Sequence, residues 1–195
     1  AGKTTTMQML SGLMEPDSGK VEAEKPVRDC VSVVFQEVDY SSKLKVKEFL
    51  RLMAVLNDRS ESLEDIIENL GLEEYRDTFV PDLSGGNKKK VNIASGLLKD
   101  PEYLLLDEPT AGLDPRARKD VRDIISDFAE ETGILVSTHS MEEAEKICDK
   151  VFIIEDGKVV VSGSPEDLIS SIQGDFIVKA EGEIPEDLNY DFVKG

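Results

Sequence analysis

Short apolar segments alternate along this chain with segments that have the 3.6-residue spacing of amphipathic helices. Nearly continuous apolar runs of strand length occur at residues 30–35, 103–106, 134–138 and 151–155. Runs of this kind are typical of strands buried on both faces, and their alternation with helical patterns predicts an α/β domain with a mostly parallel sheet. We expect these strands to form the core of one sheet.

The alternation is interrupted between the first and second strands, where no further strand pattern is present. Helical spacing instead covers residues 46–57, 62–70 and 87–98, and Gly71 stands where a helix would end. This block predicts a helical subdomain inserted into the sheet.

Local signals define the elements that follow the second strand. Asp114 and Pro115 fit a helix N-cap followed by proline at the first helical position, and this helix should run to about residue 130. Ser140 and Glu143 have the spacing of a capping box. The Asp-Gly pair at 156–157 lies between two apolar runs and predicts a tight hairpin, so the far end of the sheet should turn antiparallel.

The net charge of the chain limits the classes of molecule that it is expected to bind. The 195 residues include 23 basic and 41 acidic side chains, for a net charge of -18, which repels nucleic-acid phosphate and disfavours a nucleic-acid partner.

No apolar run approaches the roughly 18 residues needed to span a bilayer, so we expect the chain itself to be soluble. Cys30 and Cys148 lack a CxxC spacing and are expected to be free, inert thiols.

The first residues match the second half of a phosphate-binding loop, G-x-x-x-x-G-K-[ST]. They read Ala-Gly-Lys-Thr-Thr and precede a helical stretch that should extend to Leu13. Backbone N–H groups at a helix start point at phosphate, Lys3 would neutralise the β- and γ-phosphates, and the Thr4 hydroxyl would ligate magnesium. Taken alone, this tripeptide also fits an exposed, lysine-bearing N-terminus.

Two carboxylates, Asp107 and Glu108, follow directly after the second apolar run. Open α/β sheets bind their ligands at the carboxyl ends of the strands. Asp107 is suited to hold magnesium, and Glu108 to orient and deprotonate an attacking water. The alternative for this segment is a strand that ends in solvated acids before a turn.

Residues 83–87, Leu-Ser-Gly-Gly-Asn, precede a helix that continues with Lys88, Lys89 and Lys90. The two glycines leave backbone amides and the Ser84 hydroxyl open to a phosphate. A flexible turn that caps an ordinary amphipathic helix would have the same composition.

In order and spacing, these segments resemble the Walker A, signature and Walker B motifs of the ABC transporter nucleotide-binding domain. The resemblance extends from Ala1 to about Ser171. It includes Gln36 after the first strand, the loop 111–114 after Walker B, and His139 after the third strand.

The resemblance implies further roles for individual residues. His139 would hydrogen-bond the γ-phosphate and the catalytic water, and is the only histidine in the sequence. Gln36 would sense magnesium and act with Glu108 and His139 in catalysis, while relaying the state of the site to the membrane subunit. Asp114 would communicate across a dimer.

The resemblance also implies an architecture. Residues 1–40 and 99–173 would form a P-loop NTPase core with a mostly parallel sheet, residues 41–98 a helical subdomain that carries the signature motif, and residues 174–195 a C-terminal extension. Two such domains would bind ATP and Mg2+ head to tail, with nucleotide contacts from Gly2, Lys3, Thr4, Thr5, Ser84, Gly85, Gly86 and Asp114. Magnesium would be held by Thr4, Gln36 and Asp107.

In this family, ATP hydrolysis drives transport through partner permease subunits, at the cytoplasmic face of the cell membrane. Asn87, followed by Lys88 and Lys89, departs from the usual signature and is similar to lipid and drug exporters, although import stays open. The sequence also begins after the first glycine of the phosphate loop. We therefore expect the chain as given to turn over little ATP until the upstream part is restored.

Three other functions share some of these motifs, and features of the sequence argue against each. A GTPase reading of Asn87-Lys88 needs aspartate two positions further on, where Lys90 stands, and is rejected. A soluble ABC ATPase of translation or DNA repair shares most motifs, but the spacing leaves no room for long coiled coils, and the charge suits RNA poorly. A non-catalytic module in which nucleotide gates dimerisation is disfavoured by Glu108 and His139.

Overall fold

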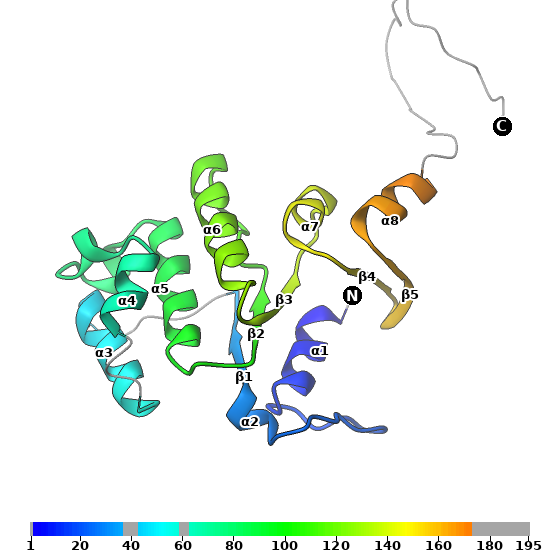
Figure 1. Ribbon diagram of the computed structural model, residues 1–195, viewed down its shortest axis with the longest axis horizontal. Coiled ribbons are helices and arrows are strands. Elements are labelled where there is room, and N and C mark those ends of the chain that lie inside the picture. The colour runs from blue at the N-terminus through cyan, green and yellow to red at the C-terminus, as the bar shows by residue number, and fades with distance from the viewer. Residues whose placement is uncertain (1, 37–42, 59–62, 173–195) are drawn as a thin grey trace, which may run out of the picture.

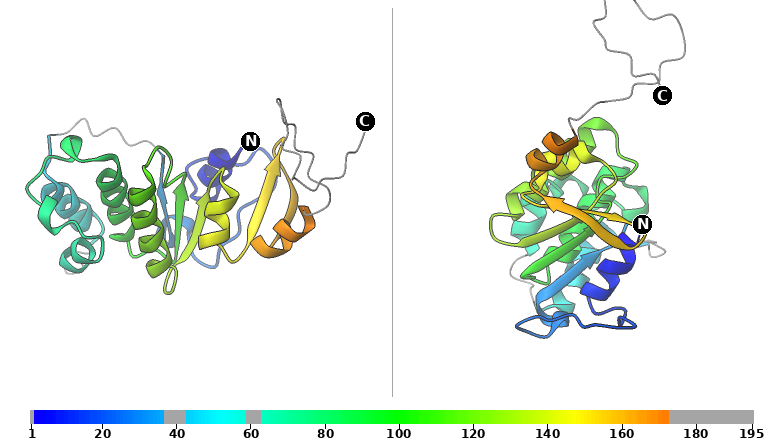
Figure 2. Two further views of the ribbon diagram at one scale, coloured as in Figure 1. Left: turned by 90° about the horizontal axis from the view of Figure 1, so that it is seen from above. Right: turned by 90° about the vertical axis from the view of Figure 1, so that its right-hand side faces the viewer.

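The chain folds into layers of helices around a small sheet (Figures 1 and 2). The computed structural model describes residues 2–36, 43–58 and 63–172. On one side of the sheet lie α5 (Gly85–Leu97) and α6 (Pro115–Phe128), and on the other lie α1 (Lys3–Leu10) and α7 (Met141–Ile147).

The central sheet is parallel throughout, as the sequence predicts. It consists of β1 (Val31–Val34), β2 (Tyr103–Asp107) and β3 (Gly133–Ser137), in the order β1-β2-β3. The register places Asp107 beside Ser137. Because the carboxyl ends of parallel strands meet at one edge, the residues that follow these strands gather there.

The segment between β1 and β2 is helical in its described parts, which confirms the interruption seen in the sequence. It contains α3 (Val46–Leu56) and α4 (Leu63–Asn69) before α5. Short 3-10 turns follow α4, at η2 (Glu73–Tyr75) and η3 (Val80–Asp82). The predicted start of the second helix, Ser62, lies outside the described residues.

Gly71 ends α4 as the sequence predicts. Its φ of 60° is left-handed, and its N–H donates to the Glu68 carbonyl at 2.9 Å. The Leu72 N–H reaches back to the Ile67 carbonyl at 2.9 Å, which completes a Schellman motif. Leu72 is then fully buried, so the chain turns from α4 directly into the core.

Helix α5 packs directly on the sheet because Gly96 has no side chain. A Cβ there would lie 2.9 Å from side-chain carbons of both Leu104 and Val34, too close for two carbon atoms. The sheet therefore fixes the position of the helix whose N-terminus carries the Ser-Gly-Gly sequence.

The last predicted strand does not join the central sheet, so that prediction is wrong. Strand β4 (Val151–Glu155) pairs with β5 (Lys158–Gly163) in a separate antiparallel sheet. The predicted turn is confirmed, because Asp156 and Gly157 both have positive φ, as a type I′ hairpin requires. Phe152 is half-exposed, so the apolar run did not mark a strand buried on both faces.

Some element boundaries also differ from the prediction. Cys30 ends a short helix, α2 (Val27–Cys30), instead of opening a strand, because the chain turns after Pro26, whose carbonyl accepts the Asp29 N–H at 2.8 Å. The helix after Gly2 ends at Leu10 and not at Leu13, since the chain turns at Gly12 with a φ of 75°.

After β5, the described chain ends in α8 (Pro165–Ile172). The predicted extension at 174–195 lies outside the described residues. In the part that the structure describes, no helix is long and apolar enough to cross a membrane.

Candidate functional site

The predicted phosphate loop and the first strand-end carboxylate meet in the structure. Gly2 adopts a left-handed conformation, φ 93°, as the N-cap of α1, which glycine does without steric cost. Within the first turn of the helix, the Thr4 hydroxyl donates a 2.7 Å hydrogen bond to Oδ2 of Asp107. Lys3 is half-buried beside them, and Thr5 is exposed on the same first turn.

Asp107 is buried and held on both oxygens. While Thr4 donates to Oδ2, the Ser137 hydroxyl of the neighbouring strand donates to Oδ1. Ser137 was not predicted from the sequence, where it reads only as the polar end of an apolar run. These bonds fix the carboxylate at the edge of the sheet.

The donors gathered here suit magnesium. Thr4 and Asp107 supply a hydroxyl and a carboxylate oxygen within hydrogen-bond distance of each other, and Mg2+ prefers oxygen ligands. Among residues 2–36, 43–58 and 63–172, no three His, Cys, Asp or Glu side chains form a metal-binding cluster.

Glu108 and His139 lie side by side at the same edge. His139 Nδ1 is 3.5 Å from Oε1 of Glu108, and the two side chains are 72% and 21% exposed. The Glu108 backbone is left-handed, φ 46°, and its N–H donates to both the carbonyl (3.1 Å) and the hydroxyl (3.0 Å) of Ser137. The pair is thus fixed by the backbone yet open to a ligand.

Lys89, on α5, connects two of the strand ends. Its Nζ donates to the Gln36 carbonyl at 2.7 Å and lies 3.4 Å from the Glu108 carbonyl. Gln36 follows β1 as predicted, with an exposed side chain. Sequence analysis noted Lys89 only as part of a lysine run, because nothing in the run indicates which lysine faces the sheet.

The Ser-Gly-Gly sequence forms the start of α5, as predicted. The Ser84 hydroxyl accepts the Asn87 N–H at 3.3 Å, and the helix begins at Gly85. Gly86 faces α6, where an added Cβ would lie 2.9 Å from Cβ of Ala117. The glycine therefore allows α5 and α6 to approach closely.

Asp114 caps α6, which confirms its predicted structural role. Its Oδ1 accepts the N–H groups of Arg116 at 3.0 Å and Ala117 at 3.1 Å. Ser84, Gly86 and Asp114 line one depression of about 610 Å3, whereas Glu108 and His139 line another. Within this chain, the depression at the start of α5 is therefore separate from the pocket that Glu108 and His139 line.

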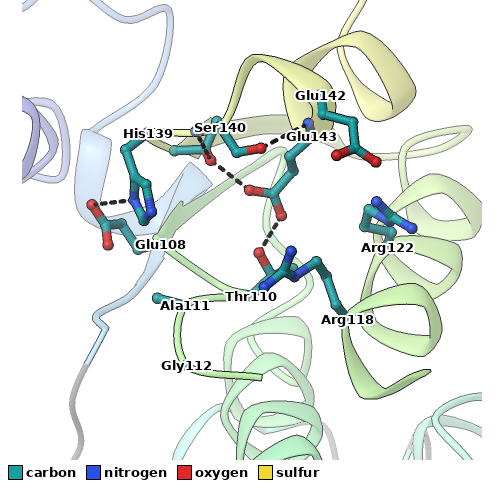
Figure 3. A pocket seen from close by; sticks show the side chains of 11 residues that line it. Glu108, Thr110, Ala111, Gly112, Arg118, Arg122, His139, Ser140, Glu142 and Glu143 are labelled. Carbon is teal, nitrogen blue, oxygen red and sulfur yellow. Dashed lines mark hydrogen bonds and ion pairs between the residues drawn. The ribbon is translucent and has the colours of Figure 1, made fainter. Parts of the chain in front are cut away.

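The pocket that Glu108 and His139 line also includes Glu143 (Figure 3). From the sequence, Glu143 was expected only to form a capping box with Ser140. As the capping box predicts, the Ser140 hydroxyl accepts the Glu143 N–H at 3.3 Å. The reciprocal bond is a wrong prediction, because the Ser140 N–H donates instead to Oγ1 of Thr138. The Glu143 carboxylate binds the hydroxyls of Thr110 and Thr138.

Two titratable groups near this pocket have perturbed pKa values. A hydrogen bond from Lys146 lowers the pKa of Glu142, with the positive charges of Lys146, Arg122 and Arg118 acting in the same sense. Burial raises the pKa of the Cys148 thiol, and the charge of Glu143 adds to it. Cys30 and Cys148 are both free, as predicted, and the raised pKa disfavours a reactive Cys148 thiolate.

Comparison with known proteins gives consistent matches. Residues 1–111 match a family model described as ABC transporter. The chain is 37% identical over 202 residues to Nod factor export ATP-binding protein I of Burkholderia lata, covering 96% of this chain and 66% of that protein. It is 32% identical over 192 residues to the lipopolysaccharide export system ATP-binding protein LptB of Haemophilus influenzae, covering 89% of this chain and 79% of LptB.

Among solved structures, CbiO1 of Clostridium perfringens, part of the ABC transporter complex CbiONQ, is similar with a TM-score of 0.78. The two sequences are 28% identical, and the alignment covers 88% of this chain and 76% of CbiO1. The chain spans about two thirds of the length of the Nod factor export proteins that it matches.

Proposed function

We propose that this chain, which belongs to the ABC transporter family, is the ATP-binding subunit of a transporter and hydrolyses ATP where Asp107 ends β2 and Glu108 follows it. The observation that carries the proposal is the meeting of Thr4, Asp107, Glu108 and His139 at one sheet edge. These residues come from three separate parts of the sequence. A hydrogen bond joins Thr4 to Asp107, and His139 contacts Glu108.

The side chains have the chemistry that hydrolysis requires. Glu108 can accept a proton from water, and His139 beside it can hydrogen-bond the water or the terminal phosphate. Lys3 and the N–H groups at the start of α1 would bind the phosphates. Thr4 and Asp107 would hold Mg2+, which neutralises phosphate charge when bound; Gln36 would assist through the magnesium shell.

The second part of the proposal is that two copies complete each site. Ser84 and Gly86 line a different depression from Glu108 and His139, which supports the proposal that this helix start binds phosphate presented by another chain. Asp114 lines the same depression and would lie at that interface. The dimer would be head to tail, with ATP between the copies.

Mixing two inactive variants of the full-length protein tests the shared site. Lys3→Ala should remove phosphate binding, and Ser84→Arg should block the helix start, so each variant alone should release no phosphate from ATP and Mg2+. A mixed dimer holds one intact pair of surfaces, so it should release phosphate at roughly half the wild-type rate, and an equimolar mixture with random pairing at roughly a quarter, since about half of its dimers are mixed. Failure to recover, with mixed dimers present, would contradict a site shared between copies.

We further infer that the subunit works at the cytoplasmic face of the membrane with permease subunits, and that the direction is export. Export is favoured by the names of two relatives and by the Asn87 variant of the signature. Purification from detergent-solubilised membranes should yield a multi-span partner. Recovery of the protein only from the soluble fraction, without such a partner, would favour a soluble ABC ATPase.

A further inference from the structure

We propose that Glu143 is a positioning residue of the hydrolysis site, which ties the loop after β2 to the loop that carries His139. The inference rests on the proposed function and deepens it. Glu143 lies on the first turn of α7, and Figure 3 shows its side chain reaching toward Thr110, with His139 and Glu108 beyond Ser140.

The Glu143 side chain is unusual in being an acid that is only 4% exposed. A buried carboxylate is costly unless hydrogen bonds replace its lost water. Here the Thr110 hydroxyl donates to one oxygen, and the Thr138 hydroxyl donates to the other at 2.5 Å. One carboxylate therefore joins two loops that lie far apart in the sequence.

The bonds on the Thr138 side enclose His139. Thr138 Oγ1 accepts the Ser140 N–H at 3.0 Å, and the Ser140 hydroxyl accepts the Glu143 N–H at 3.3 Å. The backbone before and after His139 is thus held to Glu143. A shift of this carboxylate would change the placement of the imidazole against Glu108.

The bonds on the Thr110 side lead to the proposed dimer interface. Thr110 begins the loop that ends at Asp114, and its carbonyl accepts the Leu113 N–H at 3.3 Å. Arrival of a second copy at Asp114 would move or fix this loop. The Glu143 bridge would pass that change to His139, so hydrolysis would await the assembled dimer.

A purely local role for Glu143 fits the contacts less well. As a capping box, its carboxylate would return to the N–H of Ser140, but that N–H is bound by Thr138. Helix capping therefore uses only the Glu143 N–H, and both carboxylate oxygens serve the two loops.

Steady-state ATP hydrolysis by full-length variants tests the bridge. Glu143→Gln keeps the shape but weakens both bonds, and Thr110→Val removes one hydroxyl in a nearly identical volume. We expect each to lower kcat by about tenfold or more, since small misplacements near reacting groups have large effects, while KM for ATP stays within about twofold. Thr110→Ser, which keeps the hydroxyl, should retain the wild-type kcat.

Two further variants separate positioning from folding. Glu145→Gln changes an exposed carboxylate two residues further along α7 and should leave kcat unchanged. The double variant Glu143→Gln with Thr110→Val should have the same kcat as the less active of the two single variants. The effects of residues in one hydrogen-bond network do not add.

Three results would each overturn the inference. The first is a lower thermal midpoint with unchanged kcat, and the second is an equal effect of Thr110→Val and Thr110→Ser on kcat. The third is a double variant in which the two losses of kcat multiply. If Glu143→Gln does not fold, the comparison of Thr110→Val with Thr110→Ser decides. A wild type that binds no ATP and releases no phosphate contradicts the proposed function itself, whereas an active wild type with equally active variants contradicts only the bridge.

Discussion

At the scale of single residues, the backbone of Glu108 is held in a conformation that L-residues avoid. Its φ of 46° places Cβ close to its own carbonyl, at a cost of roughly 1–2 kcal/mol. Two bonds from its N–H to Ser137 and the approach of Lys89 to its carbonyl hold it there. The strain lies at the residue to which we assign proton transfer, and strained backbone of this kind is common at functional sites.

Glycine and alanine at position 108 should reveal this strain. Both remove the carboxylate, but glycine tolerates positive φ, so Glu108→Gly should be more stable to urea than Glu108→Ala by about 1 kcal/mol. At Asp123, on the exposed part of α6, the order should reverse, because alanine favours helix. Equal midpoints for the two variants at 108 would show that its backbone is not strained.

The site residues that sequence analysis found share one property: they follow apolar strands or sit in glycine-bearing helix starts. Asp107 and Glu108 were proposed from the apolar run that they follow, whereas the role of His139 was implied only by the family resemblance. Ser137, Lys89 and Glu143 were assigned no role in the site, because their function depends on which neighbour they face across the fold. Register and helix rotation set those contacts, and neither is written in a local pattern.

At the scale of elements, the approach of α5 to α6 joins the helical block to the core. Gly86 lies at this contact, in the same turn as Ser84. Glycine at position 86 therefore allows the two helices to pack closely, in addition to any role in bringing the backbone near a phosphate. The packing within one chain is by itself a reason for glycine at this position.

Alanine at position 86 should therefore destabilise the fold. Its Cβ would lie 2.9 Å from Ala117 Cβ, and overpacking of this kind costs about 1–3 kcal/mol, which should lower the thermal midpoint. Gly85→Ala is the matched control, since its Cβ would make an ordinary 3.5 Å contact with Leu113. Equal midpoints for the two variants would contradict a tight α5–α6 contact.

The elements themselves were largely predictable, and their pairing was less so. The parallel strands β1 to β3, the helical interruption and the 156–157 turn all follow from periodicity and turn residues. The separate β4–β5 sheet could not be foreseen, because an apolar run does not specify its hydrogen-bonding partner. The division into a core at 1–40 and 99–173 and a subdomain at 41–98 stays a prediction.

At the scale of the whole molecule, the residues that we propose to form one shared site lie in two places on the chain. One holds the Thr4–Asp107 contact with Glu108 and His139, and the other holds the start of α5 with Asp114. A net charge of -18 on each copy opposes close approach, so phosphate-binding groups and magnesium would have to offset that repulsion when two copies close on ATP.

The central claim is that Glu108 drives hydrolysis of ATP bound at the Thr4–Asp107 edge, and Glu108→Gln in the full-length protein tests it most directly. ATP binding and phosphate release should be measured on the same preparation with Mg2+. The amide keeps the shape but cannot take a proton, so binding should match wild type while phosphate release falls by about 100-fold or more. Phosphate release at the wild-type rate would contradict the account.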